Sequence, residues 1–271
     1  SFLGSGITGS GQTRTVTLDI DATVGGLDFN PGASSNYIIA GTNTLTLDNG
    51  GSGVSITGAA ASNPPPHDIQ VDMLVNDAVT VTGRKLKFSG DISGTVANPD
   101  VDITVDFATN QVAEFYGNNN FGNGTLRLRG GGRNIVAGDN ATGGAGATIL
   151  FDDDSDTATL YVTPSTNPSP GNSFLSDTVV DADSARFQLR RQSADGSGSV
   201  IGAVHDFGSI TVNAGNQLEY FDQDAGSRIS IVSGEVVDLQ SGATLLMTDV
   251  NDNRSGLLII RDGATLKGNG S

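Results

Sequence analysis

Short runs in which apolar and polar residues alternate one by one recur along the whole chain. In residues 15–20, the apolar Val16, Leu18 and Ile20 are separated by polar residues. The same alternation occurs at residues 100–107, 209–212 and 228–231. Successive side chains of a β-strand point to opposite faces, so each run predicts a strand with one buried and one solvent-facing side. No stretch of twelve residues carries apolar positions at helical spacing, so we expect an all-β protein.

A leucine that opens such a run returns at regular intervals along the chain. Leu45, Leu86, Leu126, Leu245 and Leu266 are separated by 41, 40, 119 and 21 residues. These steps lie near multiples of roughly 20 residues, which suits one coil of a repeat protein. The spacing therefore predicts a β-solenoid with about 20 residues per coil, on the order of 13 coils in all.

Clusters of Gly, Asn, Asp and Ser separate the runs and mark turns. An antiparallel sandwich would also produce short strands joined by turns, but it would need hairpin connections. The nearest two-residue hairpin candidates are Asn49-Gly50 and Asn123-Gly124, and each fits equally well a corner between two faces of one coil. We therefore favour the solenoid over the sandwich.

Two proline-rich segments, near residues 62–67 and 164–172, interrupt the pattern. Proline cannot donate a hydrogen bond to a strand ladder, so both segments are expected to be loops. We expect them to project from a single solenoid spanning residues 1–271, with a two-lobed arrangement divided near the second loop as the alternative. Residues 1–11 are rich in Gly and Ser and are expected to form a flexible or inter-subunit arm.

The chain is strongly acidic, with a formal net charge of −16, and 27 of its 30 acidic residues are Asp. Aspartate is common where chains turn, because its short carboxylate bonds nearby backbone N–H groups. The charge argues against nucleic acid and against anionic membrane surfaces as partners. There is no apolar run long enough to insert into a membrane. The chain begins at Ser1 without a methionine, so we expect it to be a piece of a longer protein.

Residues 14–94 resemble the autotransporter-associated β-strand repeat family. Residues 22–32, ATVGGLDFNPG, are similar to a repeat element of that family, and residues 85–94, KLKFSGDISG, are similar to the end of its repeat. The inserted prolines at 64–66 depart from the family's pattern. Residues 95–271 resemble the family only in their general sequence character. The resemblance implies a right-handed parallel β-helix displayed in the extracellular part of a large bacterial protein. It brings no catalytic residues.

Three groups of aspartates are candidate calcium sites. They are Asp152, Asp153, Asp154 and Asp156, then Asp222 and Asp224, then Asp249 and Asp252. Calcium takes six to eight oxygen ligands, which Asp-rich loops can supply. None of the groups completes an EF-hand, so a solvated turn is the alternative at each. We expect no required cofactor, with Ca²⁺ as the candidate ligand.

Other residue types give little support for catalysis. Glycoside hydrolysis needs two positioned carboxylates, but Asp pairs are so frequent here that their presence carries little information. His67 and His205 are expected to be ordinary surface residues rather than zinc ligands. Arg186, with Arg190, is expected to neutralise aspartates 181 and 183 rather than to act as a base. We expect no enzyme activity, and rank a polysaccharide-degrading β-helix enzyme third among the functions.

Exposed aromatic residues would favour sugar binding, but the chain has no Trp. The best aromatic patches are Phe115-Tyr116, Phe121 and Tyr220-Phe221, each with a residue that could fill the interior instead. We expect an extracellular structural protein of the bacterial cell surface that self-associates into a layer or filament, because solenoid ends expose unpaired strand edges. An adhesin that binds a glycan or another surface partner through its side face is the alternative.

Overall fold

The computed structural model describes residues 13–29, 36–58, 66–108, 111–152, 157–163, 173–189, 203–222, 228–249 and 257–268. Within these ranges every regular element is a β-strand, and every strand pairing is parallel. None of the described segments forms a helix with the length and hydropathy needed to cross a membrane. The all-β solenoid predicted from the alternation is confirmed. The expected arm at residues 1–11, the loop at 164–172 and residues 62–65 of the other loop lie outside the described residues.

Two long sheets form two faces of the solenoid, and each contains ten strands. Sheet A consists of β1 (Thr13–Leu18), β4 (Asn36–Gly41), β7 (His67–Ile69), β10 (Leu86–Phe88), β13 (Val112–Phe115), β15 (Arg133–Val136), β17 (Ala158–Val162), β20 (Ser184–Leu189), β23 (Gln217–Asp222) and β26 (Thr244–Asp249). Sheet C consists of β3 (Gly26–Phe29), β6 (Val54–Gly58), β9 (Val79–Gly83), β12 (Ile103–Asp106), β14 (Thr125–Arg129), β16 (Thr148–Phe151), β19 (Asp177–Val180), β22 (Ile210–Val212), β25 (Val236–Leu239) and β28 (Thr265–Gly268).

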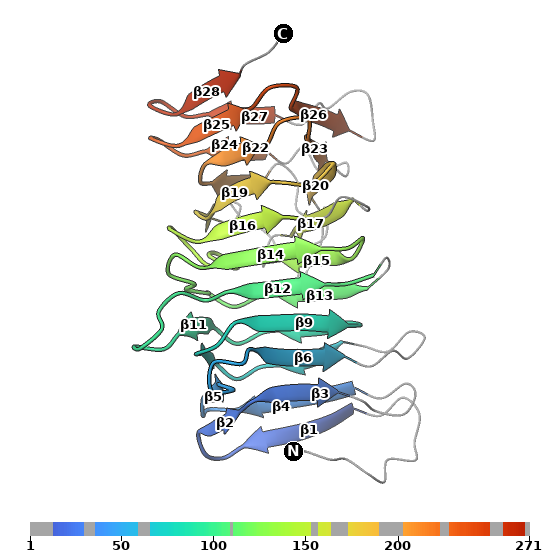
Figure 1. The fold of residues 1–271 in the computed structure, drawn as a ribbon, viewed down its shortest axis with the longest axis vertical. Helices are drawn as coiled ribbons and strands as arrows, with labels where there is room; N and C mark the ends of the chain where they lie inside the picture. Colours follow the sequence, from blue (N-terminus) through green and yellow to red (C-terminus); the bar gives the residue numbers. More distant parts are fainter. Residues whose placement is uncertain are drawn as a thin grey trace.

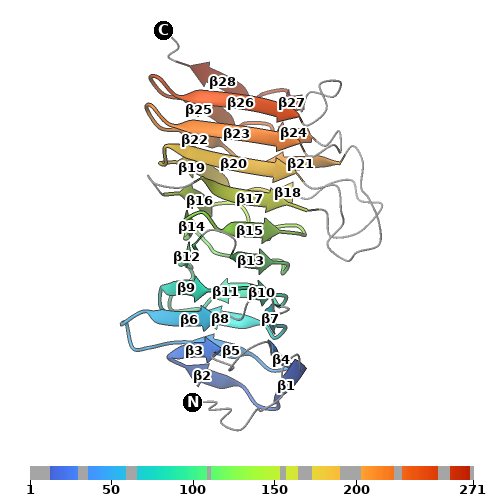
Figure 2. The same cartoon turned by 90° about the vertical axis from the view of Figure 1, so that its right-hand side faces the viewer.

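Two four-stranded sheets form the third face, and their strands lie between those of sheet A and sheet C in chain order. Sheet B contains β2 (Ala22–Val24), β5 (Leu45–Leu47), β8 (Met73–Val75) and β11 (Ile92–Gly94), and sheet D contains β18 (Ser173–Phe174), β21 (Val204–Phe207), β24 (Arg228–Ile231) and β27 (Leu257–Ile260). Between them, the Asn119 N–H donates to the Asn140 carbonyl at 3.3 Å, and the Asn140 N–H donates to the Ser173 carbonyl at 2.9 Å. The coils therefore continue along one axis from the N-terminus to the C-terminus (Figures 1 and 2).

The coils are longer than the sequence spacing predicted. Partner residues on neighbouring coils are separated by as few as 19 residues, from His67 to Leu86, and by as many as 33, from Ser184 to Gln217. The mean step is roughly 27 residues, so the predicted value of about 20 is wrong. The reason is that the five regularly spaced leucines belong to three different faces: Leu45 lies in sheet B, Leu86 and Leu245 in sheet A, and Leu126 and Leu266 in sheet C.

The core is a set of inward-facing rows that run along the axis. Ile69, Phe88 and Phe115 are register partners on β7, β10 and β13, and all are buried. The Phe88 and Phe115 rings stack with centroids 5.0 Å apart. Such offset aromatic contacts add to the free energy gained from burying the rings. The alternation fails at Ile20, expected to be buried: β1 ends at Leu18, and Ile20 is 69% exposed at the corner that follows.

Aspartates tie each coil to the next through backbone N–H groups. Asp100 Oδ1 accepts from the Asn123 N–H at 2.8 Å, and Asp102 Oδ1 accepts from the Thr125 N–H at 2.9 Å. Equivalent bonds join Asp21 to Thr44, Asp72 to Asp91, Asp91 to Asn118, Asp139 to Ser173 and Asp177 to Ser209. The corner backbone is left without ladder partners, so a short carboxylate from the neighbouring coil satisfies it. This accounts for much of the excess of Asp over Glu.

Removing one of these hydrogen bonds between an aspartate and the backbone of the next coil should destabilise the protein measurably. We expect Asp102→Ala to lower the free energy of unfolding by about 1–2 kcal/mol, because the Thr125 N–H loses a charged acceptor. Asp106→Ala, at the exposed end of β12, which begins directly after Asp102, is the matched control and should change the free energy of unfolding by less than about 0.5 kcal/mol. Urea denaturation measures both values. Equal losses in the two variants would contradict the capping role of Asp102.

Candidate ligand-binding groove on sheet A

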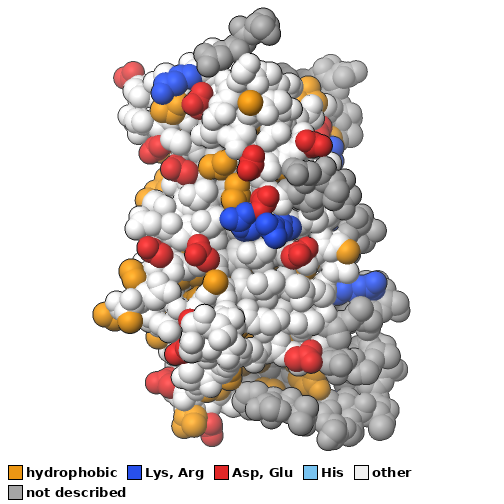
Figure 3. All heavy atoms as spheres, viewed as in Figure 1, with side chains coloured by type: hydrophobic (Ala, Val, Ile, Leu, Met, Phe, Trp, Pro, Cys, Tyr) orange, Lys and Arg blue, Asp and Glu red, His pale blue; other side chains and the backbone are white. Residues whose placement is uncertain are grey.

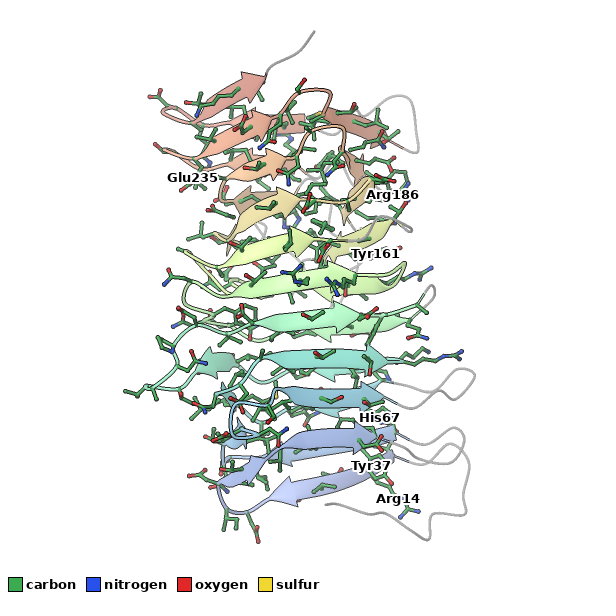
Figure 4. All side chains as sticks on the ribbon, in the orientation of Figure 1. Arg14, Tyr37, His67, Tyr161, Arg186 and Glu235 are labelled. Carbon is green, nitrogen blue, oxygen red and sulfur yellow. The ribbon has the colours of Figure 1, made fainter. Side chains whose placement is uncertain are left out.

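The outward-facing side chains of sheet A line up in rows because its strands are in register. One row contains Lys87, Glu114, Ile135, Tyr161 and Gln188, carried by β10, β13, β15, β17 and β20. The neighbouring row contains Val112, Arg133, Thr159, Arg186 and Glu219. In Figure 4, Tyr161 and Arg186 lie at neighbouring levels on one side of the molecule. Side chains far apart in sequence are thus placed side by side on one outer face.

Part of this face is hollowed into a groove of about 440 Å³, which we call the sheet A groove. Its lining consists of Pro66, Lys85, Val112, Glu114, Arg133, Ile135, Tyr161 and Gln188. The volume lies within the range typical of small-ligand sites. The lining combines two cations, one carboxylate, one amide and one aromatic ring with apolar side chains, which suits a ligand that has both polar groups and an apolar face.

Two cations of this face rest against aromatic rings. The Arg133 guanidinium carbon lies 5.7 Å from the centroid of the Tyr161 ring, and Lys87 Nζ lies 4.4 Å from that of Tyr116. Cations at such distances are attracted by the negative face of the ring. Within the part of the chain that the structure describes, neither cation makes an ion pair, and Glu114 makes none either.

Arginines elsewhere on the surface are paired with carboxylates. Arg127 and Arg129 of β14 both bind Asp152. On the face seen in Figure 3, cationic and acidic side chains meet near the middle. Partial burial raises the pKa of Asp152, but hydrogen bonds and charge from Arg129 and Arg127 outweigh it and hold that pKa below its usual value. Asp152 is thus engaged by two guanidinium groups.

Arg186 also has a carboxylate partner, though a different one from that expected. Its guanidinium pairs with Glu219 at 2.5 Å, because β20 and β23 place the two residues opposite each other. The expected pairing of Arg186 with aspartates 181 and 183 is therefore wrong, and Arg190 lies outside the described residues. Arg261 pairs with Asp206 at 2.5 Å.

Lys85 enters the groove from a backbone conformation that is unusual for a side-chain-bearing residue. Its φ is 46°, in the left-handed region that favours glycine. Its carbonyl oxygen accepts from the His67 N–H at 2.8 Å, which joins two coils at this point. Strained backbone positions of this kind persist where the surrounding structure fixes them, and they concentrate at binding sites.

The structure brings no calcium ligands together among the residues it describes. Asp153, Asp154, Asp156, Asp224 and Asp252 lie outside the described residues. Asp222 and Asp249 are register partners on β23 and β26, but their side chains are not described. No group of three or more metal-ligating side chains occurs in the described ranges. The calcium sites stay a prediction.

Both histidines are buried, so the prediction that they lie on the surface is wrong. His67 is 1% exposed and His205 is fully buried. His67 begins β7 on an inward-facing row, stacks on Phe29 with centroids 4.9 Å apart, and accepts the Tyr37 N–H on Nδ1 at 3.0 Å. Figure 4 shows it one level above Tyr37. Burial lowers the pKa of each histidine to about 4, with the nearby Asp206 charge partly opposing this at His205.

The aromatic patches divide between the interior and the surface. Phe115, Phe121 and Tyr220 are buried, which bears out the expectation that some of these residues fill the core. Tyr116 lies under Lys87, and Phe221 lies under Arg186 at 5.2 Å. The groove residues Glu114, Arg133, Tyr161 and Gln188 were not among the sequence candidates. Alternation marks Glu114 as outward-facing, but only the coil lengths bring these side chains together.

No family model, curated protein or solved structure matches the chain. Two features of the described residues bear on function. They are the outermost strands at the two ends of the solenoid and the sheet A groove.

Proposed function

We propose that this chain is an extracellular structural protein, a β-solenoid building block that joins end to end into a filament or layer at the bacterial cell surface. The observation that carries the proposal is that the outermost strands at each end of the described solenoid have no further strand partner among the described residues. The extracellular bacterial location is supported by the resemblance of residues 14–94 to the autotransporter-associated β-strand repeat family.

The C-terminal end is apolar. The last described strands, β26, β27 and β28, are the outermost strands of sheets A, D and C. Leu266 is 57% exposed there, Leu246 41% and Met247 39%. Unpaired strand edges with exposed apolar side chains form a template for pairing with another chain.

The N-terminal end offers a complementary edge. β1, β2 and β3 are the outermost strands of sheets A, B and C, so each end of the described solenoid presents one strand from each of three faces. All the strand pairings that the structure describes are parallel, so a second copy could continue the ladders without reversing direction. Such a head-to-tail contact is heterologous and propagates into an open filament.

The side-chain pattern at the contact between two stacked copies also favours a second copy of the chain as the binding partner. In sheet C, Val237 pairs with Leu266 and Asp238 pairs with Lys267. On β3, Leu27 is buried and Asp28 is exposed, in the same alternation. If the ladder continues with Leu27 of the next copy on Leu266, Asp28 falls beside Lys267. The contact between the two copies would then combine an apolar pair in the solenoid interior with an opposite-charge pair on its surface.

A charge swap tests this arrangement. We expect the wild-type chain to associate in a concentration-dependent way in sedimentation velocity. Lys267→Glu or Asp28→Lys alone should weaken association by about threefold to tenfold, because each places like charges together, and the double variant should restore it. Asp106→Lys, on the side of sheet C, is the control and should have no effect. A wild-type chain that stays monomeric at every concentration, or a double variant no better than the singles, would contradict the proposal.

A further inference from the structure

We propose that the sheet A groove binds an acidic oligosaccharide, one whose sugar rings carry carboxylate groups. This function goes beyond end-to-end association. The groove lies on the side of the solenoid, so the stacking of copies end to end would not cover it. It gives the glycan-binding alternative a specific location and ligand class. The two proposals can fail independently of each other.

The cations of the groove would recognise the carboxylates. Arg133 is solvent-exposed, lies against Tyr161, and makes no ion pair among the described residues. Its planar guanidinium matches a carboxylate through two parallel hydrogen bonds. Lys85 lines the same groove and adds a second positive charge. In a chain with a net charge of −16, the presence of two cations in one groove is a specific feature of the groove rather than a property of the whole surface.

The uncharged part of the lining would recognise the sugar ring. Tyr161 lines the groove, and Ile135 and Val112 add apolar lining beside it. Aromatic rings with an apolar face and a polar edge suit surfaces where one side of a ligand is apolar and the other is wet. Glu114 lines the groove and can accept hydrogen bonds from hydroxyl groups.

An acidic peptide is the competing ligand of similar charge, and the groove suits it less well. Glu114 lines the groove and can accept hydrogen bonds from the hydroxyl groups of a sugar, whereas the carboxylate side chains of an acidic peptide offer no such donor. The strands that form the groove floor, β13, β15 and β17, are each paired on both sides. No strand edge is therefore free at this point to extend the sheet with a peptide.

The test is isothermal titration calorimetry of the full chain with defined oligosaccharides. The probes are oligogalacturonate of four to six units, the same oligosaccharide with its carboxylates reduced to alcohols, and a short polyglutamate peptide. We expect oligogalacturonate to bind about tenfold or more tightly than either other probe, since charged hydrogen bonds contribute most to such a contact. Its binding should weaken as salt is added.

Variants locate the binding. Arg133→Gln should weaken oligogalacturonate binding by about tenfold or more, and Tyr161→Leu should weaken it while Tyr161→Phe preserves it. Arg228→Gln, an exposed arginine on β24, is the matched control and should bind within about twofold of wild type. The proposal is overturned if wild type does not bind oligogalacturonate, if the reduced sugar or polyglutamate binds as tightly, or if Arg133→Gln binds like Arg228→Gln. Unchanged melting temperatures of the variants exclude unfolding as the cause of a loss.

Discussion

Replacing Gly83 with alanine is expected to destabilise the solenoid by more than about 3 kcal/mol. Gly83 ends β9 at a φ of 93°, beside Gly58, which ends β6 on the neighbouring coil. A Cβ atom on Gly83 would lie 1.8 Å from the Gly58 carbonyl oxygen, so the two coils would have to separate at this corner. Urea denaturation of the purified variant measures the loss.

Gly50→Ala is the control for the backbone effect alone. Gly50 also has a positive φ, 64°, but a Cβ there would have no neighbour within 4 Å. We expect it to cost about 1–2 kcal/mol, the penalty of the left-handed conformation without a clash. If Gly83→Ala proved no more destabilising than Gly50→Ala, the close contact between coils at this corner would be refuted.

Mild acid is expected to destabilise the protein through its two buried histidines. The pKa of each is lowered by burial from 6.5 to about 4 in the folded state. Between these values the unfolded chain binds more protons than the folded one. Stability is therefore lost as the pH falls from about 6.5 to about 4, by up to about 3 kcal/mol for each histidine.

The contribution of each histidine can be isolated by replacing it with a residue that does not titrate. His67→Gln and His205→Gln will each lower stability at pH 7, but the further loss between pH 7 and pH 4 should shrink by up to about 3 kcal/mol in each variant. The comparison uses the difference between the two pH values, so it is independent of the packing change. An acid loss of the same size in wild type and in both variants would show that the histidines do not titrate in this window.

The sequence allowed the class of fold to be predicted, because alternation and turn residues act locally. The run at residues 100–107 contains β12, and Asn49-Gly50 forms a corner between β5 and β6, which belong to two faces of one coil. The length of a coil could not be read in the same way. Leu45, Leu86 and Leu126 lie in similar strands, but these strands belong to three different faces. The spacing between the leucines therefore does not equal the length of one coil.

The candidate groove could not have been predicted for a related reason. Arg133 and Tyr161 are neighbours because β15 and β17 pair in a particular register, and that register depends on a corner length that varies from coil to coil. His67 illustrates the same limit. Three prolines precede it and suggested an exposed loop, yet it starts β7 on an inward-facing row. The local sequence pattern predicts which residues lie in strands. Only the register between stacked coils determines which side chains contact one another.

Both proposals depend on one claim, that each coil adds a single strand to sheet A and a single strand to sheet C at constant register. Pulsed electron spin resonance tests it directly, because the chain has no cysteine and labels can be introduced at chosen sites. Ser55, Leu150, Thr211 and Asp238 lie in one outward-facing row of sheet C, on β6, β16, β22 and β25.

Ser55 would be labelled together with each of the other three positions in turn, which lie four, six and seven strands away. At about 4.8 Å per strand, the backbone separations should be about 19, 29 and 34 Å. The account predicts label distances that rise in this order by about 10 and then about 5 Å. Distances that do not increase with the number of intervening strands would contradict it.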